Sequence, residues 1–138
     1  MNAEQLQDLI ARQRPGHALE RTFYTDEGIY RRELERIFMR SWQYAGHVSE
    51  IPKVGDWFLF EFGAESVIVV RSAEDSIRAL VNVCRHRGSR VRTEPRGCAN
   101  RFTCPYHGWT YGLDGRLLVA AYMDDAFDKS KHGLKTIH

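Results

Sequence analysis

Hydrophobic residues follow a helical period in the first third of this chain and a strand-like pattern in the rest. In residues 3–13, apolar side chains recur every three or four positions until Pro15 interrupts the run. A second run with the same period extends over residues 25–39, and either Thr25 or Asp26 can cap its first turn. We therefore expect two short N-terminal helices.

From about residue 55, β-branched and aromatic residues replace the helical pattern. The runs W-F-L-F-E-F, S-V-I-V-V-R and I-R-A-L-V-N-V predict strands, which polar turns at residues 63–65 and 73–75 separate. A further strand is expected near residues 100–103. Residues 109–111 and 116–119 predict a hairpin, because the L-D-G sequence between them contains the strong turn signal Asp-Gly. Short strands joined by tight turns predict a mainly β, antiparallel domain.

The composition is that of an ordinary globular domain, with 43% hydrophobic residues, 28% charged residues and a formal net charge of +2. No run approaches the roughly 18 apolar residues of a membrane-spanning helix. The N-terminus lacks the basic start and apolar core of a secretory signal. Three cysteines are too few for a disulfide scaffold. We therefore expect a cytoplasmic protein without membrane contact, in a compartment where thiols stay reduced.

The candidate chemistry lies in two mixed pairs of metal-binding side chains. Cys84 pairs with His86 in C-R-H, and Cys104 pairs with His107 in C-P-Y-H. Tetrahedral zinc also binds two Cys and two His, but usually from C-x2–4-C and H-x3–5-H pairs. A Rieske-type [2Fe–2S] centre needs the mixed arrangement, with two Cys on one iron and two His on the other. The spacing therefore favours such a cluster and leaves zinc as the alternative.

Two neutral imidazoles in place of two thiolates change the charge of the centre. Two ferric ions, two sulfides and two thiolates sum to zero, and a neutral centre accepts an electron readily. The expected reduction potential is roughly −150 to +300 mV, against about −400 mV for plant-type ferredoxins. Gly88 and Gly108 let the backbone N–H groups of the two loops approach the cluster, and Tyr106 and Trp109 are expected to shield it. The predicted chemistry is one-electron transfer.

C-R-H-R-G and C-P-Y-H-G-W at this separation resemble the Rieske motif of Rieske-type non-haem iron oxygenases, the terminal components of ring-hydroxylating dioxygenases and related demethylases and monooxygenases. N-V, F-T and T-Y-G-L-D-G-R-L beside the motifs are similar as well, so the resemblance covers about residues 23–138. It implies a Rieske-type β domain over residues 41–122, with the cluster-binding loops at its tip. Residues 1–40 would be an N-terminal helical segment, and residues 123–138 a link toward a catalytic domain.

The resemblance also implies partners and a second iron outside this sequence. Full-length subunits of the family carry a catalytic domain whose mononuclear Fe(II) is held by two His and a carboxylate. We expect this chain to be a piece of such an oxygenase or a shortened gene product, able to carry electrons but not to oxygenate a substrate alone. The family implies a reductase or ferredoxin as donor, a homo-oligomer, usually a trimer, and aromatic or quaternary ammonium substrates. A stand-alone Rieske ferredoxin is the alternative, although the helical N-terminus argues against it.

Six arginines lie between Cys84 and Cys104, with Glu94 as the only acid among them. An arginine-rich zinc module that binds nucleic acid would suit such a stretch, but a net charge of only +2 argues against a nucleic-acid partner. An acidic electron donor fits better, because Arg85 and Arg87 would steer it to the edge of the cluster.

Other candidate ligands are isolated in the sequence. Cys98 has no partner at ligand spacing and is expected to be a free thiol. Asp128, His132 and His138 have the composition of a two-His, one-carboxylate site, but no apolar framework surrounds them. We expect these three residues to belong to a polar tail.

Overall fold

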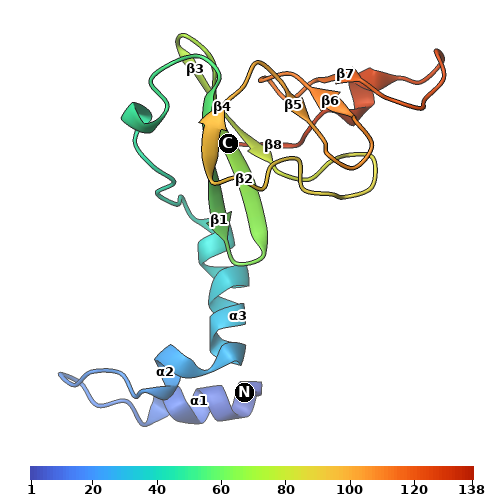
Figure 1. Cartoon of the computed structure of the whole chain (residues 1–138). Coiled ribbons are helices and arrows are strands. Elements are labelled where there is room, and N and C mark those ends of the chain that lie inside the picture. The colour runs from blue at the N-terminus through green and yellow to red at the C-terminus, as the bar shows by residue number, and fades with distance from the viewer. The chain divides into compact units, whose positions relative to one another are not determined.

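The computed structural model describes all 138 residues, in two compact units formed by residues 1–44 and 45–138. The first unit is helical and contains α1 (Ala3–Ala11), α2 (Thr22–Thr25), α3 (Glu27–Arg36) and the 3₁₀ turn η1 (Phe38–Arg40), drawn in blue to cyan in Figure 1. The second unit holds every strand, so the two sequence patterns correspond to two parts of the chain. None of the helices has the length and apolar character that crossing a membrane requires.

Both predicted helices begin at a polar cap. The Asn2 side chain accepts a hydrogen bond from the Gln5 N–H (2.9 Å), and the Gln5 side chain accepts one from the Asn2 N–H (3.0 Å), which forms a capping box. Asp26 caps α3 by accepting a hydrogen bond from the Ile29 N–H (3.0 Å). The second helix is shorter than the sequence predicts, because α3 ends at Arg36 and η1 replaces its last turn.

Two antiparallel sheets form the second unit, which confirms the predicted mainly β fold. The first sheet has the order β4-β1-β2-β3-β8 and consists of β1 (Asp56–Phe62), β2 (Glu65–Ala73), β3 (Ser76–Val81), β4 (Arg96–Cys98) and β8 (Thr136–Ile137). The second has the order β5-β6-β7 and consists of β5 (Phe102–Thr103), β6 (Thr110–Tyr111) and β7 (Leu117–Val119). The 3₁₀ turns η2 (Val48–Glu50) and η3 (Lys129–His132) complete the unit (Figure 1).

Side chains from both sheets share one hydrophobic core. Trp57 on β1 lies opposite Val70 on β2 and meets Phe102 of the second sheet edge-on, with ring centroids 6.1 Å apart and an interplanar angle of 87°. Burying one large apolar side chain contributes about 1.5–3 kcal/mol. Cys84 and Cys104 belong to the same buried cluster, so both candidate ligand loops start from the core.

Asn82 holds the first ligand loop from inside the fold. Its side chain is fully buried, and its Oδ1 accepts hydrogen bonds from the N–H groups of Val91 (3.0 Å) and Arg92 (2.8 Å). Its Nδ2 donates to the Ser66 Oγ (3.0 Å) and to the Arg92 carbonyl (2.7 Å). All four hydrogen-bonding positions of the amide are satisfied, and leaving one buried partner unpaired costs about 1–3 kcal/mol. The loop after β3 is therefore fixed to the sheet at both ends.

The C-terminal segment returns to the core of the second unit. Leu134 is buried, and its N–H donates to the Gly115 carbonyl (2.8 Å). β8 then pairs with β3, with Ile137 opposite Ala79. Residues 123–138, predicted as a link toward a further domain, thus include a core side chain and an edge strand. Their role as a link, and the predicted boundaries of all three segments, stay predictions.

Candidate metal centre

The two loops that carry the candidate ligands share a pattern of backbone hydrogen bonds. In each loop, the glycine four residues after the cysteine donates its N–H to the cysteine carbonyl, at 2.9 Å from Gly88 to Cys84 and at 3.0 Å from Gly108 to Cys104. Each cysteine N–H donates to the carbonyl of the residue five positions later, at 2.8 Å in both loops. Both glycines have a positive φ, +75° and +73°, which a glycine adopts without the strain of a Cβ. Both Cys–His pairs therefore lie on turns that have the same backbone hydrogen bonds.

The cysteines of the two turns are buried beside each other. Cys84 and Cys104 are each 2% exposed, and neither forms a disulfide. Burial raises the pKa of the Cys84 thiol above its ordinary value, and the Cys104 thiol beside it adds to the increase. Two buried thiolates so close together repel each other, so a cation between them is what would let both lose their protons.

The imidazoles of the two turns meet edge to face. The ring centroids of His86 and His107 lie 4.7 Å apart, with an interplanar angle of 75°. Desolvation lowers the pKa of His86, and the charges of His107 and Arg87 lower it further, so the neutral form that binds metals is favoured. The Nδ1 atom of His86 is buried without a hydrogen-bond partner. An unpaired buried nitrogen is rare in folded proteins, and metal coordination would satisfy it.

This arrangement suits two metal ions better than one. The candidate ligands pair by type, with thiol beside thiol and imidazole beside imidazole. A zinc site with two Cys and two His needs four donors around one ion. A two-iron centre needs only two protein donors on each iron. The two adjacent thiols and the two adjacent imidazoles therefore fit a [2Fe–2S] cluster.

Tyr111 contacts the candidate ligand Cys84, although no local sequence pattern indicates this. Its hydroxyl oxygen lies 3.2 Å from the Cys84 Sγ and accepts a hydrogen bond from the Arg85 N–H (3.0 Å). An iron-bound thiolate has no proton, so once Cys84 holds iron the hydroxyl is the donor of its contact with the sulfur. Burial raises the pKa of Tyr111, and the hydrogen bond with Cys84 raises it further, so the donor keeps its proton. No spacing rule connects a residue on β6 with a cysteine 27 positions earlier.

Tyr106 and Trp109, the predicted shields, cover the two imidazoles in different ways. Trp109 is buried and lies almost parallel to His86, with ring centroids 4.8 Å apart at 11°. Its Nε1 donates to the Ala121 carbonyl (3.2 Å), so its polar group faces away from the pairs. Tyr106 stacks on His107, with centroids 3.8 Å apart at 34°, but 61% of it is exposed. One face of His86 is therefore covered by a buried indole, whereas His107 lies under a surface ring, and both imidazoles are half-buried.

The six arginines between the pairs divide into two groups. Three are engaged within the chain: Arg90 pairs with Glu61, Arg96 pairs with Glu50 at 3.8 Å, and the Arg92 guanidinium lies over the rings of Trp57 (5.6 Å) and Phe102 (5.4 Å). The other three, Arg85, Arg87 and Arg101, are exposed and form no ion pair. Two of these three flank His86.

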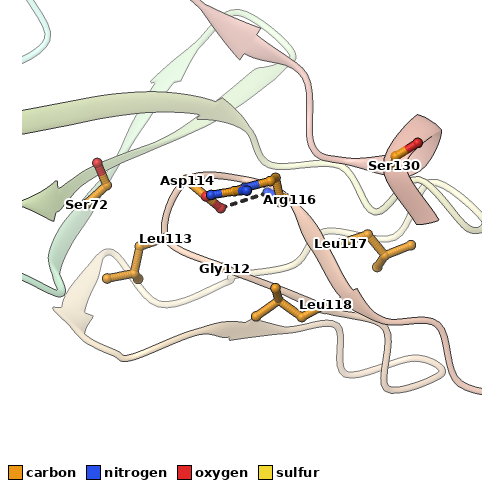
Figure 2. A pocket seen from close by; sticks show the side chains of 8 residues that line it. All are labelled: Ser72, Gly112, Leu113, Asp114, Arg116, Leu117, Leu118 and Ser130. Atoms are coloured by element: carbon orange, nitrogen blue, oxygen red, sulfur yellow. Dashed lines mark hydrogen bonds and ion pairs between the residues drawn. The ribbon is translucent and has the colours of Figure 1, made fainter.

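The remaining candidate residues lie apart from the four ligands. Cys98 is an exposed free thiol on β4. His132 packs on Phe127, and its Nδ1 lies 3.0 Å from the Asp128 carbonyl. A cavity of about 700 Å³ lies between Ser72, the turn around the Asp114–Arg116 ion pair, and η3 (Figure 2). None of the four candidate ligands lines it.

Comparisons with known proteins bear on this site. Residues 41–132 match the family model described as the Rieske [2Fe-2S] domain. The glycine betaine monooxygenase oxygenase subunit of Chromohalobacter salexigens is 41% identical over 131 residues, which cover 94% of this chain and 29% of that protein. The biphenyl 2,3-dioxygenase subunit alpha of Rhodococcus jostii is 46% identical over 109 residues, which cover 79% of this chain and 24% of that protein. This chain spans less than a third of the length of these relatives.

Solved structures give the same picture. Naphthalene 1,2-dioxygenase from Rhodococcus sp., bound to indole, matches 83% of this chain with a TM-score of 0.78 and 36% identity, over 27% of its own chain. The quaternary ammonium Rieske monooxygenase CntA, in complex with L-carnitine, matches 83% of this chain with a TM-score of 0.74 and 36% identity, over 33% of its own chain.

Proposed function

This chain belongs to the Rieske [2Fe–2S] domain family, and we propose that Cys84 and Cys104 hold one iron of the cluster while His86 and His107 hold the other. The observation that carries this proposal is the repeated turn, which puts the two buried thiols side by side and the two imidazoles in contact. The buried, unpaired Nδ1 of His86 is the atom that we assign to iron. Each loop then contributes one ligand to each iron.

A cluster bound in this way supplies one-electron transfer, at a potential above that of plant-type ferredoxins. The side chains around it set the conditions for that transfer. Tyr111 directs its proton at the Cys84 sulfur, which stabilises the more negative, reduced state. Trp109 keeps water from one face of His86. His107 lies under the exposed ring of Tyr106 and is half-buried.

We further propose that the chain acts as the N-terminal part of an oxygenase alpha subunit. In that protein the electron would pass to a mononuclear Fe(II) in a catalytic domain, across the subunit boundary of a trimer. The named relatives act on glycine betaine and on biphenyl. Hydroxylation or demethylation of a quaternary ammonium or aromatic compound is therefore the proposed activity of the whole protein. Buried, free cysteines favour a reducing location, which we assign to the cytoplasm.

The proposed electron donor is an acidic reductase or ferredoxin. Arg85 and Arg87 support this proposal, because they flank His86, are exposed, and have no carboxylate partner within the chain. Like-charged residues beside a redox site attract a partner of opposite charge and raise its association rate, most strongly at low ionic strength.

Anaerobic reconstitution of the 138-residue chain with iron and sulfide tests the cluster assignment. We expect two irons and two sulfides per chain, a red-brown colour, and a low-temperature paramagnetic signal after one-electron reduction with dithionite. Cys84→Ser and His107→Ala should lose most of the bound iron, whereas Cys98→Ser, a matched cysteine variant outside the pairs, should retain it. A colourless protein with one zinc ion per chain would refute the proposal and favour the zinc alternative.

A further inference from the structure

The chain segment after β7 covers the indole that lies against one face of His86. Trp109 presents one face to His86, and its other sides contact Phe127 (5.5 Å between ring centroids, 65°) and His132 (6.1 Å, 85°). We call residues 121–132 the strap. Trp109 is only 2% exposed, so the strap and the second ligand loop together keep water from the indole.

Hydrogen bonds and a ring contact hold the strap at its start and near its end. At its start, the Ala121 carbonyl accepts the hydrogen bond from the Trp109 Nε1 (3.2 Å). Near its end, the Lys129 Nζ donates to the Leu118 carbonyl (3.2 Å), and the rings of Phe127 and His132 lie against each other at 4.5 Å. The strap therefore cannot shift without moving side chains that touch the indole.

The beginning of the strap has an unusual backbone conformation. Tyr122 has a φ of +68° and is the one non-glycine residue of the chain with a positive φ. Such a conformation is unfavourable for a residue with a Cβ, and it persists only where surrounding contacts impose it. Tyr122 itself is 87% exposed, and the residue before it, Ala121, is held by the hydrogen bond from Trp109.

We propose that the strap holds the Trp109 indole flat against His86 and thereby sets the reduction potential of the centre, with Phe127 and His132 as positioning residues. This inference rests on the proposed cluster assignment. One-electron reduction makes the centre more negative, and a dry, apolar face beside a ligand disfavours the added charge. Releasing the indole would admit water to His86, stabilise the reduced state, and raise the potential.

The experiment compares reconstituted Phe127→Ala and His132→Ala with the unaltered chain in a mediated redox titration followed by visible absorbance. At a fixed potential, we expect the ratio of reduced to oxidised protein to rise at least about threefold. This corresponds to about 30 mV, at about 59 mV per tenfold for a one-electron couple. The g-values of the reduced centre should shift as well. Phe127→Tyr and His132→Phe keep a ring at each position and should restore both readouts.

Two control variants test whether the effect is specific to the strap, and two conservative variants serve if the alanine variants lose iron. Tyr24→Ala and His17→Ala remove exposed rings from the helical unit and should leave the potential unchanged. If the alanine variants lose iron, Phe127→Leu and His132→Gln, which keep side-chain volume without the ring, replace them in the comparison. Unaltered potential and g-values in ringless variants with full iron content would overturn the inference. Absence of a cluster from the unaltered chain would instead refute the proposed function.

Discussion

Removal of a single hydroxyl at Tyr111 offers the sharpest test of how this site is tuned. In Tyr111→Phe the Cys84 sulfur loses a donor at 3.2 Å, and the Arg85 N–H loses its acceptor at 3.0 Å. The ring itself, which has no exposed surface, stays in the core. Because the sulfur carries more negative charge after reduction, the lost hydrogen bond stabilised the reduced state more than the oxidised state.

The magnitude follows from the strength of the bond. A hydrogen bond contributes about 0.5–1.5 kcal/mol net, and one to a charged group about 1.5–3 kcal/mol. The difference between the two redox states is therefore about 1 kcal/mol. At about 59 mV for each tenfold change in equilibrium constant, this lowers the potential by about 40 mV. The unpaired Arg85 N–H should also destabilise the fold by about 1–3 kcal/mol.

Mediated redox titration measures the first effect and urea unfolding of the metal-free chain measures the second. Tyr106→Phe is the matched control, because Tyr106 is exposed and its hydroxyl makes no hydrogen bond to either cysteine. An unchanged or increased potential in Tyr111→Phe would refute the reasoning. The sign is informative, since loss of the strap contacts is expected to move the potential in the opposite direction.

Three further predictions concern charge, backbone and pH. Arg87→Glu should slow reduction of the chain by an acidic plant-type ferredoxin in stopped-flow mixing, most strongly at low salt. Arg78→Glu, the same change on β3, should leave the reduction rate unchanged. Equal reduction rates for Arg87→Glu and the unaltered chain at every ionic strength would contradict the donor proposal. Gly88→Ala should destabilise the chain by about 1–2 kcal/mol and lower iron retention, because the φ of Gly88 is +75°. Gly16→Ala is the control, since Gly16 has a φ of +76° and equally open surroundings. It should lower the thermal midpoint without changing the iron content. Hydrogen bonds from Ser130 and Lys131 lower the pKa of Asp128. This carboxylate therefore adds stability above its unfolded pKa and loses that contribution as pH falls through the lower, folded pKa. Asp128→Asn should therefore be less stable than the unaltered chain near pH 6 in urea unfolding, and this difference should shrink as pH falls below about 4, the ordinary pKa of an aspartate. A difference that stays constant in acid would contradict this.

The sequence predicted the elements whose signals are local. Asp26 was one of two candidate caps for the second helix, and the Asp-Gly turn near residue 114 joins β6 and β7 as expected. The mixed Cys and His pairs also identified the family, because their spacing is set by turn geometry within each loop. These features depend on residues only a few positions apart.

Features that depend on distant contacts were not predicted. The pairing of β8 with β3 joins segments more than fifty positions apart, and the polar composition of the tail conceals both this pairing and the return of Leu134 to the core. The division of the arginines depends on which carboxylate or ring each side chain reaches. Arg90 and Arg87 look alike in the sequence, yet only Arg90 finds a carboxylate.

The first ligand loop extends from β3 of one sheet, whereas the second loop connects two strands of the other. A cluster held by both loops, as proposed, would join the two sheets in addition to their shared hydrophobic core, so its binding free energy would add to the stability of the fold. Loss of the cluster would therefore weaken the link between the two sheets, and we expect proteases to cleave the metal-free chain faster than the loaded chain.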